Sequence, residues 1–299
     1  MTINTGAPVV VGVDGSAAAL DAVRVAAREA GYRHRPLRVV HAFSSPLTAA
    51  AAFGTAPFAL PLDDLRKQAE EFVAEAVAEA TKLAPDVPVT GAVADGAATP
   101  VLIDESHHAA LVVLGHRGLG GFAGLLIGSV TVQVSARAEC PVLVVRGEAR
   151  ADGPVVVGVD GSALSVEAVG FAFEEASRRD APLVAVHAWL DPVAVLPGDV
   201  LPMVEDLKVL ADEEERVLAE SVAGWAERYP DVPVRHRLVH GSPAQVLVDE
   251  ARDAQLVVVG AHGRGALGGL LLGSVSHAVL HHAHAPVAIV RHPRTAGRS

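Results

Sequence analysis

Lysine is nearly absent from this sequence. The 299 residues contain only Lys67, Lys82 and Lys208, and the formal net charge at pH 7 is −11. Proteins that hold nucleic acid do so with clustered lysine and arginine side chains that neutralise the phosphates. We therefore expect no nucleic-acid partner for this chain.

Cysteine and long apolar segments are also scarce. The single cysteine, Cys140, excludes a disulfide bond within the chain, and its place directly before an apolar run indicates a small buried side chain. The N-terminus lacks the basic segment and apolar core of a secretion signal, and no apolar run is long enough to cross a bilayer. We therefore expect a cytoplasmic protein without a membrane partner.

The sequence does contain a long phrase that occurs twice. Each copy has two glycines, a gap of nine residues and a glycine-serine pair: Gly115, Gly118, Gly128 and Ser129 in the first copy, and Gly260, Gly263, Gly273 and Ser274 in the second. The copies lie 145 positions apart (260 − 115), and other phrases recur at nearly this offset: VVVGVDGS at 9–16 and 155–162, VHA at 40–42 and 186–188, CPVLVVR at 140–146 and APVAIVR at 285–291. This period indicates duplicated domains, since solenoid repeats span roughly 20 to 50 residues.

The duplication predicts two domains, 1–147 and 154–299. The segment between them, GEARADG, is polar and flanked by glycine, as linkers tend to be. Domains of about 145 residues can bury roughly two-thirds of the surface that an unfolded chain exposes. With 51% hydrophobic and 20% charged residues, the composition is that of a globular protein.

Each half alternates strand-like and helix-like segments. In the first half the predicted strands are 9–13, 37–42, 87–94, 111–114 and 142–145. Several are apolar on both faces, which is typical of a parallel sheet covered by helices. A helix is predicted over 63–83, where apolar residues recur at three-and-four spacing. We therefore predict a three-layer α/β/α fold in each half, with ligands at the carboxyl ends of the strands.

The first strand of each half ends in an Asp-Gly-Ser turn, whose residues have two interpretations. Ser16 and Ser162 either cap the following helix, the commonest role of serine at such a point, or contact a ligand. Asp14 and Asp160 either act as caps or face the ligand crevice. In the crevice a carboxylate would accept hydrogen bonds from a ribose or an adenine, or help to hold Mg²⁺ beside phosphates.

The repeated glycine phrase follows an apolar strand and opens a helix, which is the arrangement of an anion site. Glycine at its first two positions predicts a backbone with positive φ that approaches phosphates closely. The glycine-serine pair begins a helix whose amides and hydroxyl would bind them. Thr131 and Ser276, two residues on, either add a second hydroxyl or bond back within the helix. The alternative for the glycines is a loop that only needs tight turns.

On these phrases the chain resembles the universal stress protein family. VVVGVDGS, VHA, the spaced glycine-serine phrase and CPVLVVR match along nearly the whole chain, twice over, and the duplicated length is similar to the tandem-domain members. The resemblance implies a five-stranded parallel sheet of order 3-2-1-4-5 in each domain, of the Rossmann-like, adenine nucleotide alpha hydrolase-like type. It also implies that each domain binds ATP.

The resemblance further assigns residues to the ATP sites. It implies that Asp14 with Ala42, and Asp160 with Ala188, flank the adenosine, while the glycine-serine phrases hold the phosphates. The residues expected to bind ATP in the first domain are Val13, Asp14, Gly15, Ser16, Ala42, Gly115, Arg117, Gly118, Gly128, Ser129, Val130 and Thr131. Those in the second are Val159, Asp160, Gly161, Ser162, Ala188, Gly260, His262, Gly263, Arg264, Gly273, Ser274, Val275 and Ser276. No metal site made by protein alone is expected, and Mg²⁺ would accompany ATP near the two aspartates.

The two copies differ beside the second glycine. The second copy keeps the family's arginine there as Arg264, whereas the first has Leu119 and carries Arg117 one step before the glycine. Either arginine would neutralise phosphate charge. We therefore expect the two domains to differ in ATP affinity.

Fourteen histidines raise the alternative of a metal site at His281, His282 and His284. This segment ends a predicted helix, where the dipole favours cations, so a solvated helix terminus is the simpler interpretation. His41 and His187 end the second strand of each half. No serine, cysteine or carboxylate constellation accompanies them, so we expect structural or crevice-lining roles.

Three other classes of function fit the sequence less well. A P-loop NTPase needs a lysine in its glycine loop, and neither phrase has one. A dinucleotide oxidoreductase places its loop after the first strand, not the fourth. An adenylate-handling enzyme or slow ATPase on the same fold needs a committed acid, base or nucleophile, and none is recognisable. We therefore expect an ATP-binding regulatory protein and not an enzyme.

Two apolar, proline-containing connections, 44–62 and 190–202, follow the second strands. They are candidates for core coverings, for lids over the adenosine, or for contacts between domains or subunits. The resemblance also implies pairing of the closing strands of neighbouring domains. We therefore expect a homodimer or an intramolecular domain pair, besides a regulatory protein partner.

Overall fold

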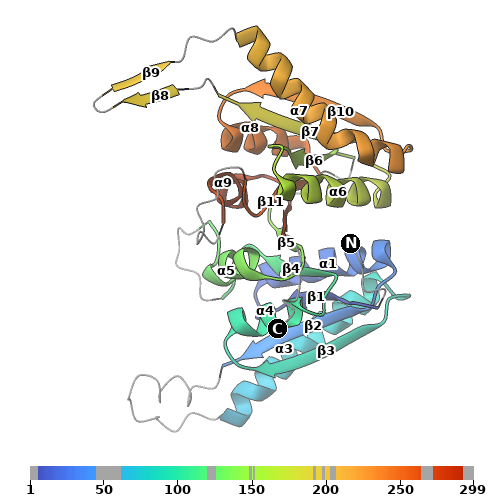
Figure 1. Ribbon diagram of the computed structural model, residues 1–299. Coiled ribbons are helices and arrows are strands. Elements are labelled where there is room, and N and C mark those ends of the chain that lie inside the picture. The colour runs from blue at the N-terminus through green and yellow to red at the C-terminus, as the bar shows by residue number, and fades with distance from the viewer. Residues whose placement is uncertain are drawn as a thin grey trace, which may run out of the picture. The chain divides into compact units, whose positions relative to one another are not determined.

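The structure is a computed structural model that describes residues 6–44, 62–119, 126–147, 150, 152–190, 193–196, 199–202, 207–263 and 272–291. The chain divides into two compact units, which we call the first unit (Met1–Arg146 with Arg291–Ser299) and the second unit (Gly147–Val290). In each unit, helices cover both faces of a parallel sheet (Figure 1).

The first unit alternates strands and helices along the chain. Its elements are β1 (Val9–Gly12), α1 (Ala17–Arg33), β2 (Leu37–Phe43), α3 (Leu62–Leu83), β3 (Val89–Asp95), α4 (Ala98–Ser106), β4 (Leu111–Gly115), α5 (Ser129–Arg137) and β5 (Val142–Val145). The strands lie in the order β3-β2-β1-β4-β5, and each neighbouring pair is parallel. Val11 of β1 pairs with Val39 of β2 and with Val113 of β4. The carboxyl ends of these three strands therefore stand side by side.

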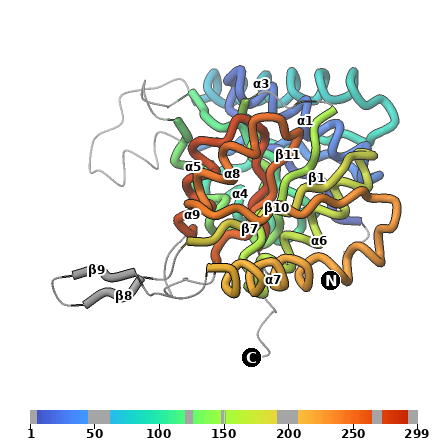
Figure 2. Tube along the Cα trace, turned by 90° about the horizontal axis from the view of Figure 1, so that it is seen from above, coloured from blue at the N-terminus to red at the C-terminus, as the bar shows by residue number. Residues whose placement is uncertain are grey.

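Apolar side chains, mostly valine, explain why these segments form the centre of a sheet. Residues 9–11 of β1 and 111–113 of β4 are fully buried. A strand buried on both faces requires a helix layer on each side. α1 and α3 pack together on one face, and α4 and α5 pack together on the other (Figures 1 and 2). The apolar side chains that α1 buries recur at three-and-four spacing, and most are small: Ala19, Ala22, Val23, Ala26, Ala27 and Ala30.

The second unit repeats this architecture. Its elements are β6 (Val155–Gly158), α6 (Ala163–Arg178), β7 (Leu183–Trp189), β8 (Val193–Leu196), β9 (Asp199–Pro202), α7 (Leu207–Arg228), β10 (Val234–His240), α8 (Pro243–Glu250), the short 3₁₀ turn Ala251–Asp253, β11 (Leu256–Gly260), α9 (Ser274–His282) and β12 (Val287–Val290). The order β10-β7-β6-β11-β12 is again parallel throughout. The three-layer fold with strand order 3-2-1-4-5, predicted for each half, is confirmed.

The connection 190–202 contains an element that was not predicted. β8 and β9 pair as an antiparallel hairpin, with Val195 opposite Val200. The Pro-Gly pair at 197–198 is a turn signal that would have indicated it. The corresponding connection of the first half lies, over 45–61, outside the described residues.

Helix α7 packs against α6 through a close contact between Trp225 and Gly170. A Cβ on Gly170 of α6 would lie 2.4 Å from the indole ring of Trp225, so only glycine leaves room for that ring. The Trp225 ring stacks on Tyr229 with their centroids 6.4 Å apart, and Tyr229 stacks on Phe173 at 6.0 Å. The environment of Trp225 therefore reports the packing of these two helices, which lie side by side in Figure 2.

A buried ion pair lies near the C-terminal end of the first helix in each unit. In α1 the Arg33 guanidinium bonds the Glu29 carboxylate, and the two side chains are 6% and 3% exposed. In the second unit Arg179 bonds Glu175, at 8% and 1% exposure, and Arg178 reaches the same carboxylate at 2.9 Å. Helix geometry brings residues three and four apart together. A charge this deeply buried depends on its partner, because removal from water is costly.

Candidate functional site

A cavity lies at the carboxyl ends of the strands in each unit, with a volume of about 420 Å³ in the first and about 300 Å³ in the second. The sequence-predicted residues that line the first are Val13, Asp14, Ala42, Gly115, Arg117, Gly118, Gly128, Ser129, Val130 and Thr131. Those that line the second are Val159, Asp160, Ala188, Gly260, His262, Gly263, Gly273, Ser274, Val275 and Ser276. In each unit, three strand ends and a helix start therefore contribute to one cavity.

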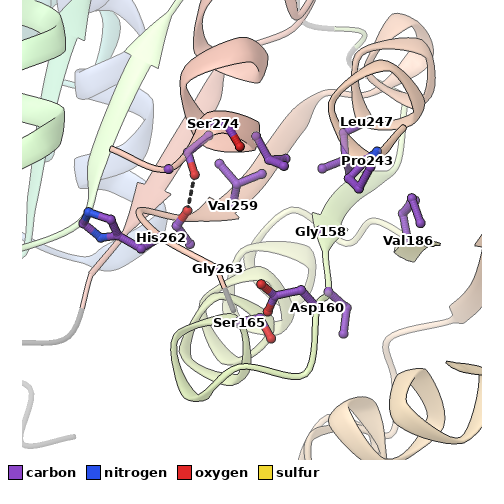
Figure 3. Close-up of a pocket in the computed structure, with 16 residues that line it drawn as sticks. Gly158, Asp160, Ser165, Val186, Pro243, Leu247, Val259, His262, Gly263 and Ser274 are labelled. Atoms are coloured by element: carbon purple, nitrogen blue, oxygen red, sulfur yellow. Dashed lines mark hydrogen bonds between the residues drawn. The ribbon is translucent and has the colours of Figure 1, made fainter. Parts of the chain in front are cut away.

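Further lining residues were not predicted as site residues. They are Gly12, Ala19, Val40, Ala98, Leu102, Leu114 and Ile127 in the first unit, and Gly158, Ser165, Val186, Pro243, Leu247 and Val259 in the second. Ala98 with Leu102, and Pro243 with Leu247, form i,i+4 pairs on the first turns of α4 and α8. In Figure 3, Pro243 and Leu247 lie together on one side of the cavity, away from Asp160 and Ser165. A pair of apolar residues at i,i+4 spacing, directly after a strand, is the sequence pattern that would have indicated these four residues.

Four of the predicted residues have other roles. Gly15 and Gly161 turn the chain with φ of +84° and +73°, a conformation that favours glycine. The Ser16 hydroxyl accepts a hydrogen bond from the Ala19 amide at 3.2 Å, and Ser162 does the same for Ser165. These serines are helix caps, as the first of their two interpretations predicted. None of the four is among the described residues that line these two cavities.

The two aspartates do line the cavities, and their carboxylates bond to the backbone. Asp14 Oδ1 accepts from the Ser16 amide at 3.0 Å, and its Oδ2 accepts from the Leu119 amide at 2.8 Å. Asp160 Oδ1 accepts from the Ser162 amide at 2.9 Å. Each carboxylate therefore fixes the turn after the first strand while it faces the cavity.

The glycines of the repeated phrase provide space and not positive φ, so the prediction of positive φ was wrong. The glycines with positive φ in the described residues are Gly15, Gly96, Gly147, Gly161 and Gly241. A Cβ on Gly115 would lie 2.6 Å from the carbonyl oxygen of Ala18, and a Cβ on Gly118 would lie 2.2 Å from Asp14 Oδ2. The sequence could not reveal this, because both neighbours are distant along the chain.

Two hydrogen bonds join the two ends of the glycine loop, the name that we give to residues 115–128 in the first unit and 260–273 in the second. Thr131 Oγ1 donates to the Gly115 carbonyl at 2.9 Å, and the Gly128 amide donates to the His116 carbonyl at 2.8 Å. The second unit repeats both, from Ser276 to Gly260 at 2.6 Å and from Gly273 to Ala261 at 2.8 Å. The two hydroxyls thus bond to the strand end and not within their own helix, which corrects one of the predicted alternatives.

The helices that follow the loops begin without a side-chain cap. Gly128 and Gly273 are the N-cap residues of α5 and α9, and no side chain bonds the first-turn amides there in the described part of the chain. These amides and the positive end of the helix dipole favour an anion. Each cavity therefore has one wall that suits a phosphate group.

His41 and His187 hold the ends of β1 and β6. Nδ1 of His41 donates to the Val13 carbonyl at 2.9 Å, and Nδ1 of His187 donates to the Val159 carbonyl at 2.6 Å. His187 is buried, and its Nε2 also lies 2.6 Å from a carboxylate oxygen of Glu214. His41 lines the first cavity. Both predicted roles, structural and crevice-lining, are therefore present.

The cationic residues beside the loops differ between the units. Arg117 lines the first cavity, and the corresponding residue of the second, His262, lines the other. Arg264 lies outside the described residues. The first cavity therefore has a guanidinium group at the position where the second has an imidazole.

Among the described residues, no three histidine, cysteine, aspartate or glutamate side chains gather as a metal site. His281 and His282 end helix α9, and the His281 ring stacks on that of His277 at 4.3 Å. Cys140 is buried, and burial raises the pKa of its thiol to about 12. This confirms the prediction of a small buried side chain. In the part of the chain that the structure describes, no helix has the length and apolarity needed to cross a membrane.

Acid is expected to destabilise the first unit through His116. Burial, and then the charge of Arg117, lower the pKa of His116 below its usual value near 6.5. As the pH falls through that value the unfolded chain binds the proton first, so stability is lost until the folded-state pKa is reached. His116→Ala should reduce the loss of stability between pH 7.5 and 5.5, measured by urea unfolding monitored by circular dichroism.

The second unit provides a native precedent for this change, because it has Ala261 at the corresponding position. An unaltered acid slope in the His116→Ala protein would show that other groups cause it.

Comparisons with known proteins match both halves of the chain. The model of the universal stress protein family matches residues 7–146 and 153–291. Universal stress protein Rv2005c of Mycobacterium tuberculosis is 42% identical over 296 residues, which cover 95% of this chain and 96% of that protein.

Solved structures resemble the chain as well. The crystal structure of a universal stress protein from Archaeoglobus fulgidus DSM 4304 has a TM-score of 0.70 at 18% identity, covers 95% of this chain, and is itself covered to 98%. At that identity it shows the fold alone. A universal stress protein in complex with cAMP is 30% identical, covers 46% of this chain with 95% of its own, and has a TM-score of 0.35.

Proposed function

The chain belongs to the universal stress protein family, with two such domains in tandem, and on this premise we propose that it binds ATP in both domains as a nucleotide-dependent regulator. One observation carries the proposal: both cavities combine a strand-end carboxylate, glycines that leave the backbone accessible and an uncapped helix start. Carboxylates suit sugar hydroxyls, and helix N-termini suit phosphates. The two kinds of group therefore match the two ends of a nucleotide.

Cavity size and lining support the same ligand. Volumes of about 300 and 420 Å³ lie in the range of small-molecule sites. Leu102 in the first cavity and Leu247 in the second supply apolar surface. We assign the adenosine to Asp14 with Ala42 and to Asp160 with Ala188. We assign the phosphates to the glycine-serine phrases, with Arg117 as a neutralising charge in the first domain.

Magnesium enters the proposal only with the nucleotide. The described lining of each cavity includes one carboxylate, and that of Asp14 already accepts two backbone hydrogen bonds. Mg²⁺ is commonly held by one or two carboxylates together with phosphate oxygens and water. We therefore do not propose an ion bound by the protein alone. We propose instead that Mg²⁺ binds together with the nucleotide near Asp14 or Asp160.

A regulatory role is proposed in preference to catalysis because the titratable groups of the first cavity have structural partners. Asp14 is bonded by two amides, and Nδ1 of His41 by the Val13 carbonyl. Both groups thus hold the strand end and its turn in place, and we infer that this positioning is their main role. Slow ATP hydrolysis is compatible with this proposal. We also propose that the two domains pair, or that the chain forms a homodimer.

The proposal is tested with Ser129→Asp and Ser274→Asp combined in one protein. A carboxylate at the first position of α5 or α9 favours the helix, because it faces the positive end of the dipole. The same carboxylate repels phosphate. We expect unchanged or higher thermal stability together with ATP affinity at least about tenfold weaker, measured by calorimetric titration.

Ser129→Ala with Ser274→Ala is the matched control, because it removes the hydroxyls without adding charge. ADP, AMP, cAMP and GTP are titrated beside ATP, and the nucleotide that co-purifies with wild type is identified by mass spectrometry. Absence of ATP binding by wild type at millimolar concentration would refute the proposal. Rapid turnover of ATP would favour an enzyme instead.

A further inference from the structure

One carboxylate joins the two walls of the first cavity. Asp14 follows β1, and its Oδ1 accepts from the Ser16 amide in its own turn at 3.0 Å. Its Oδ2 accepts from the amide of Leu119 at 2.8 Å, across a sequence separation of 105 residues. Leu119 follows Gly118 in the glycine loop. The side chain of Asp14 is therefore a direct link between the β1 turn and that loop.

The second unit has the same approach of carboxylate to loop. Asp160 Oδ1 accepts from the Ser162 amide at 2.9 Å, as Asp14 does from Ser16. A Cβ on Gly263 would lie 2.4 Å from Asp160 Oδ2. In Figure 3 the Asp160 side chain lies beside Gly263. Two copies of the arrangement indicate that it is a feature of the fold.

This contact explains the second glycine of the phrase. Gly118 does not have positive φ, so its backbone does not require glycine. A Cβ would instead lie 2.2 Å from Asp14 Oδ2, which is far shorter than the contact distance between a non-bonded carbon and oxygen. At Gly128 in the same loop, by contrast, the nearest atom to a Cβ would be 3.6 Å away. The carboxylate of Asp14 therefore requires glycine at residue 118, whereas the described neighbours of Gly128 would allow a Cβ there.

We propose that Asp14 and Asp160 are positioning residues that clamp the start of the glycine loop, residues 115–119 in the first unit and 260–263 in the second, in its ligand-binding conformation before nucleotide binds; that the ligand is a nucleotide rests on the proposed function. A hydrogen bond from an amide to an ionised carboxylate is stronger than one to a neutral acceptor. A loop that is held in advance loses less freedom when the ligand binds. Each carboxylate oxygen also keeps a second lone pair, so the clamp leaves acceptors for a ribose hydroxyl.

The first test follows the Leu119 amide by NMR in the ligand-free full chain. Asp14→Asn removes the charge at nearly constant shape. We expect hydrogen exchange at Leu119 to become at least about tenfold faster and its amide proton to shift upfield, with thermal stability little changed. Gly128→Ala is the matched control and should leave the Leu119 signal unchanged. An unaltered Leu119 amide in Asp14→Asn would overturn the clamp, whatever the protein binds.

The second test is a double-mutant cycle of Asp14→Ala and Gly118→Ala. Alone, Gly118→Ala should displace the loop and weaken ATP binding at least about tenfold, because its Cβ meets Oδ2. In the Asp14→Ala background it should have no further effect, since the clashing atom is gone. Additive effects would overturn the pairing of glycine with carboxylate. A coupled cycle in the NMR signals with no ATP affinity in wild type would support the clamp and refute the proposed function.

Discussion

Gly115→Ala should destabilise the first unit by about 3 kcal/mol and abolish the nucleotide binding that we propose for it, whereas Gly260→Ala should cost about 1 kcal/mol or less. A Cβ at residue 115 would lie 2.6 Å from the carbonyl oxygen and 2.8 Å from the carbonyl carbon of Ala18. These are backbone atoms of α1, so no side chain can rotate away and the helix itself must move from β4. At Gly260 the nearest atoms are Leu164 Cγ at 3.2 Å and the His262 carbonyl oxygen at 3.3 Å, so a displacement of a few tenths of an ångström would make room for a Cβ.

The two units can be followed separately in this experiment. Both tryptophans, Trp189 and Trp225, belong to the second unit. Tryptophan fluorescence during urea unfolding therefore reports that unit alone, while far-ultraviolet circular dichroism reports both. Gly115→Ala should shift the dichroism transition and leave the fluorescence transition in place. Equal effects of Gly115→Ala and Gly260→Ala would contradict the steric explanation.

Glu175→Ala should destabilise the second unit by about 3 to 5 kcal/mol. The Glu175 carboxylate is 1% exposed and bonds two arginines, Arg178 and Arg179. The substitution removes a carboxylate that the Arg179 guanidinium, 8% exposed, bonds in a site largely shielded from water. The expected result is an early fluorescence transition in urea, because the tryptophans report this unit.

Glu220→Ala is the matched control for Glu175→Ala. Glu220 pairs with Arg216 at the same i,i+4 spacing, at 3.0 Å, but both side chains are 64% exposed. Exposed pairs of this kind contribute about 1 kcal/mol or less. If both substitutions had the same small effect, burial would not be what makes the Glu175 pair important.

The elements of the fold were predictable because each depends on residues close together in the sequence. The apolar run Val9–Gly12 indicates a buried strand, and the three-and-four spacing of apolar residues in Leu62–Leu83 indicates a helix. The bounds predicted for the first half agree with the observed strands and helix to within two residues. The exception is the β8–β9 hairpin, because the prolines of 190–202 favour an irregular connection.

The roles of single site residues were less predictable, because they depend on neighbours distant in sequence. In the sequence, Gly118 looks the same whether it serves a turn, a phosphate or a carboxylate. Only the structure distinguishes these cases, because a Cβ at this position would lie 2.2 Å from Asp14 Oδ2. Thr131 bonds a carbonyl 16 residues back, which no local rule for serine and threonine indicates. Ser16 was predictable, by contrast, because a cap acts within one helical turn.

The 105-residue separation between Asp14 and Leu119 bears on how the chain folds. A contact of such high sequence separation forms only after β1 and β4 have been brought together, and it is absent from any fragment that lacks either strand. A ligand that needs this contact binds the native state and not the unfolded one. At a free concentration 100 times its dissociation constant, such a ligand adds about 2.7 kcal/mol to the stability of the state that binds it. If nucleotide is that ligand, as we propose, its depletion would lower the stability of the first unit by this amount and make the chain more susceptible to proteolysis.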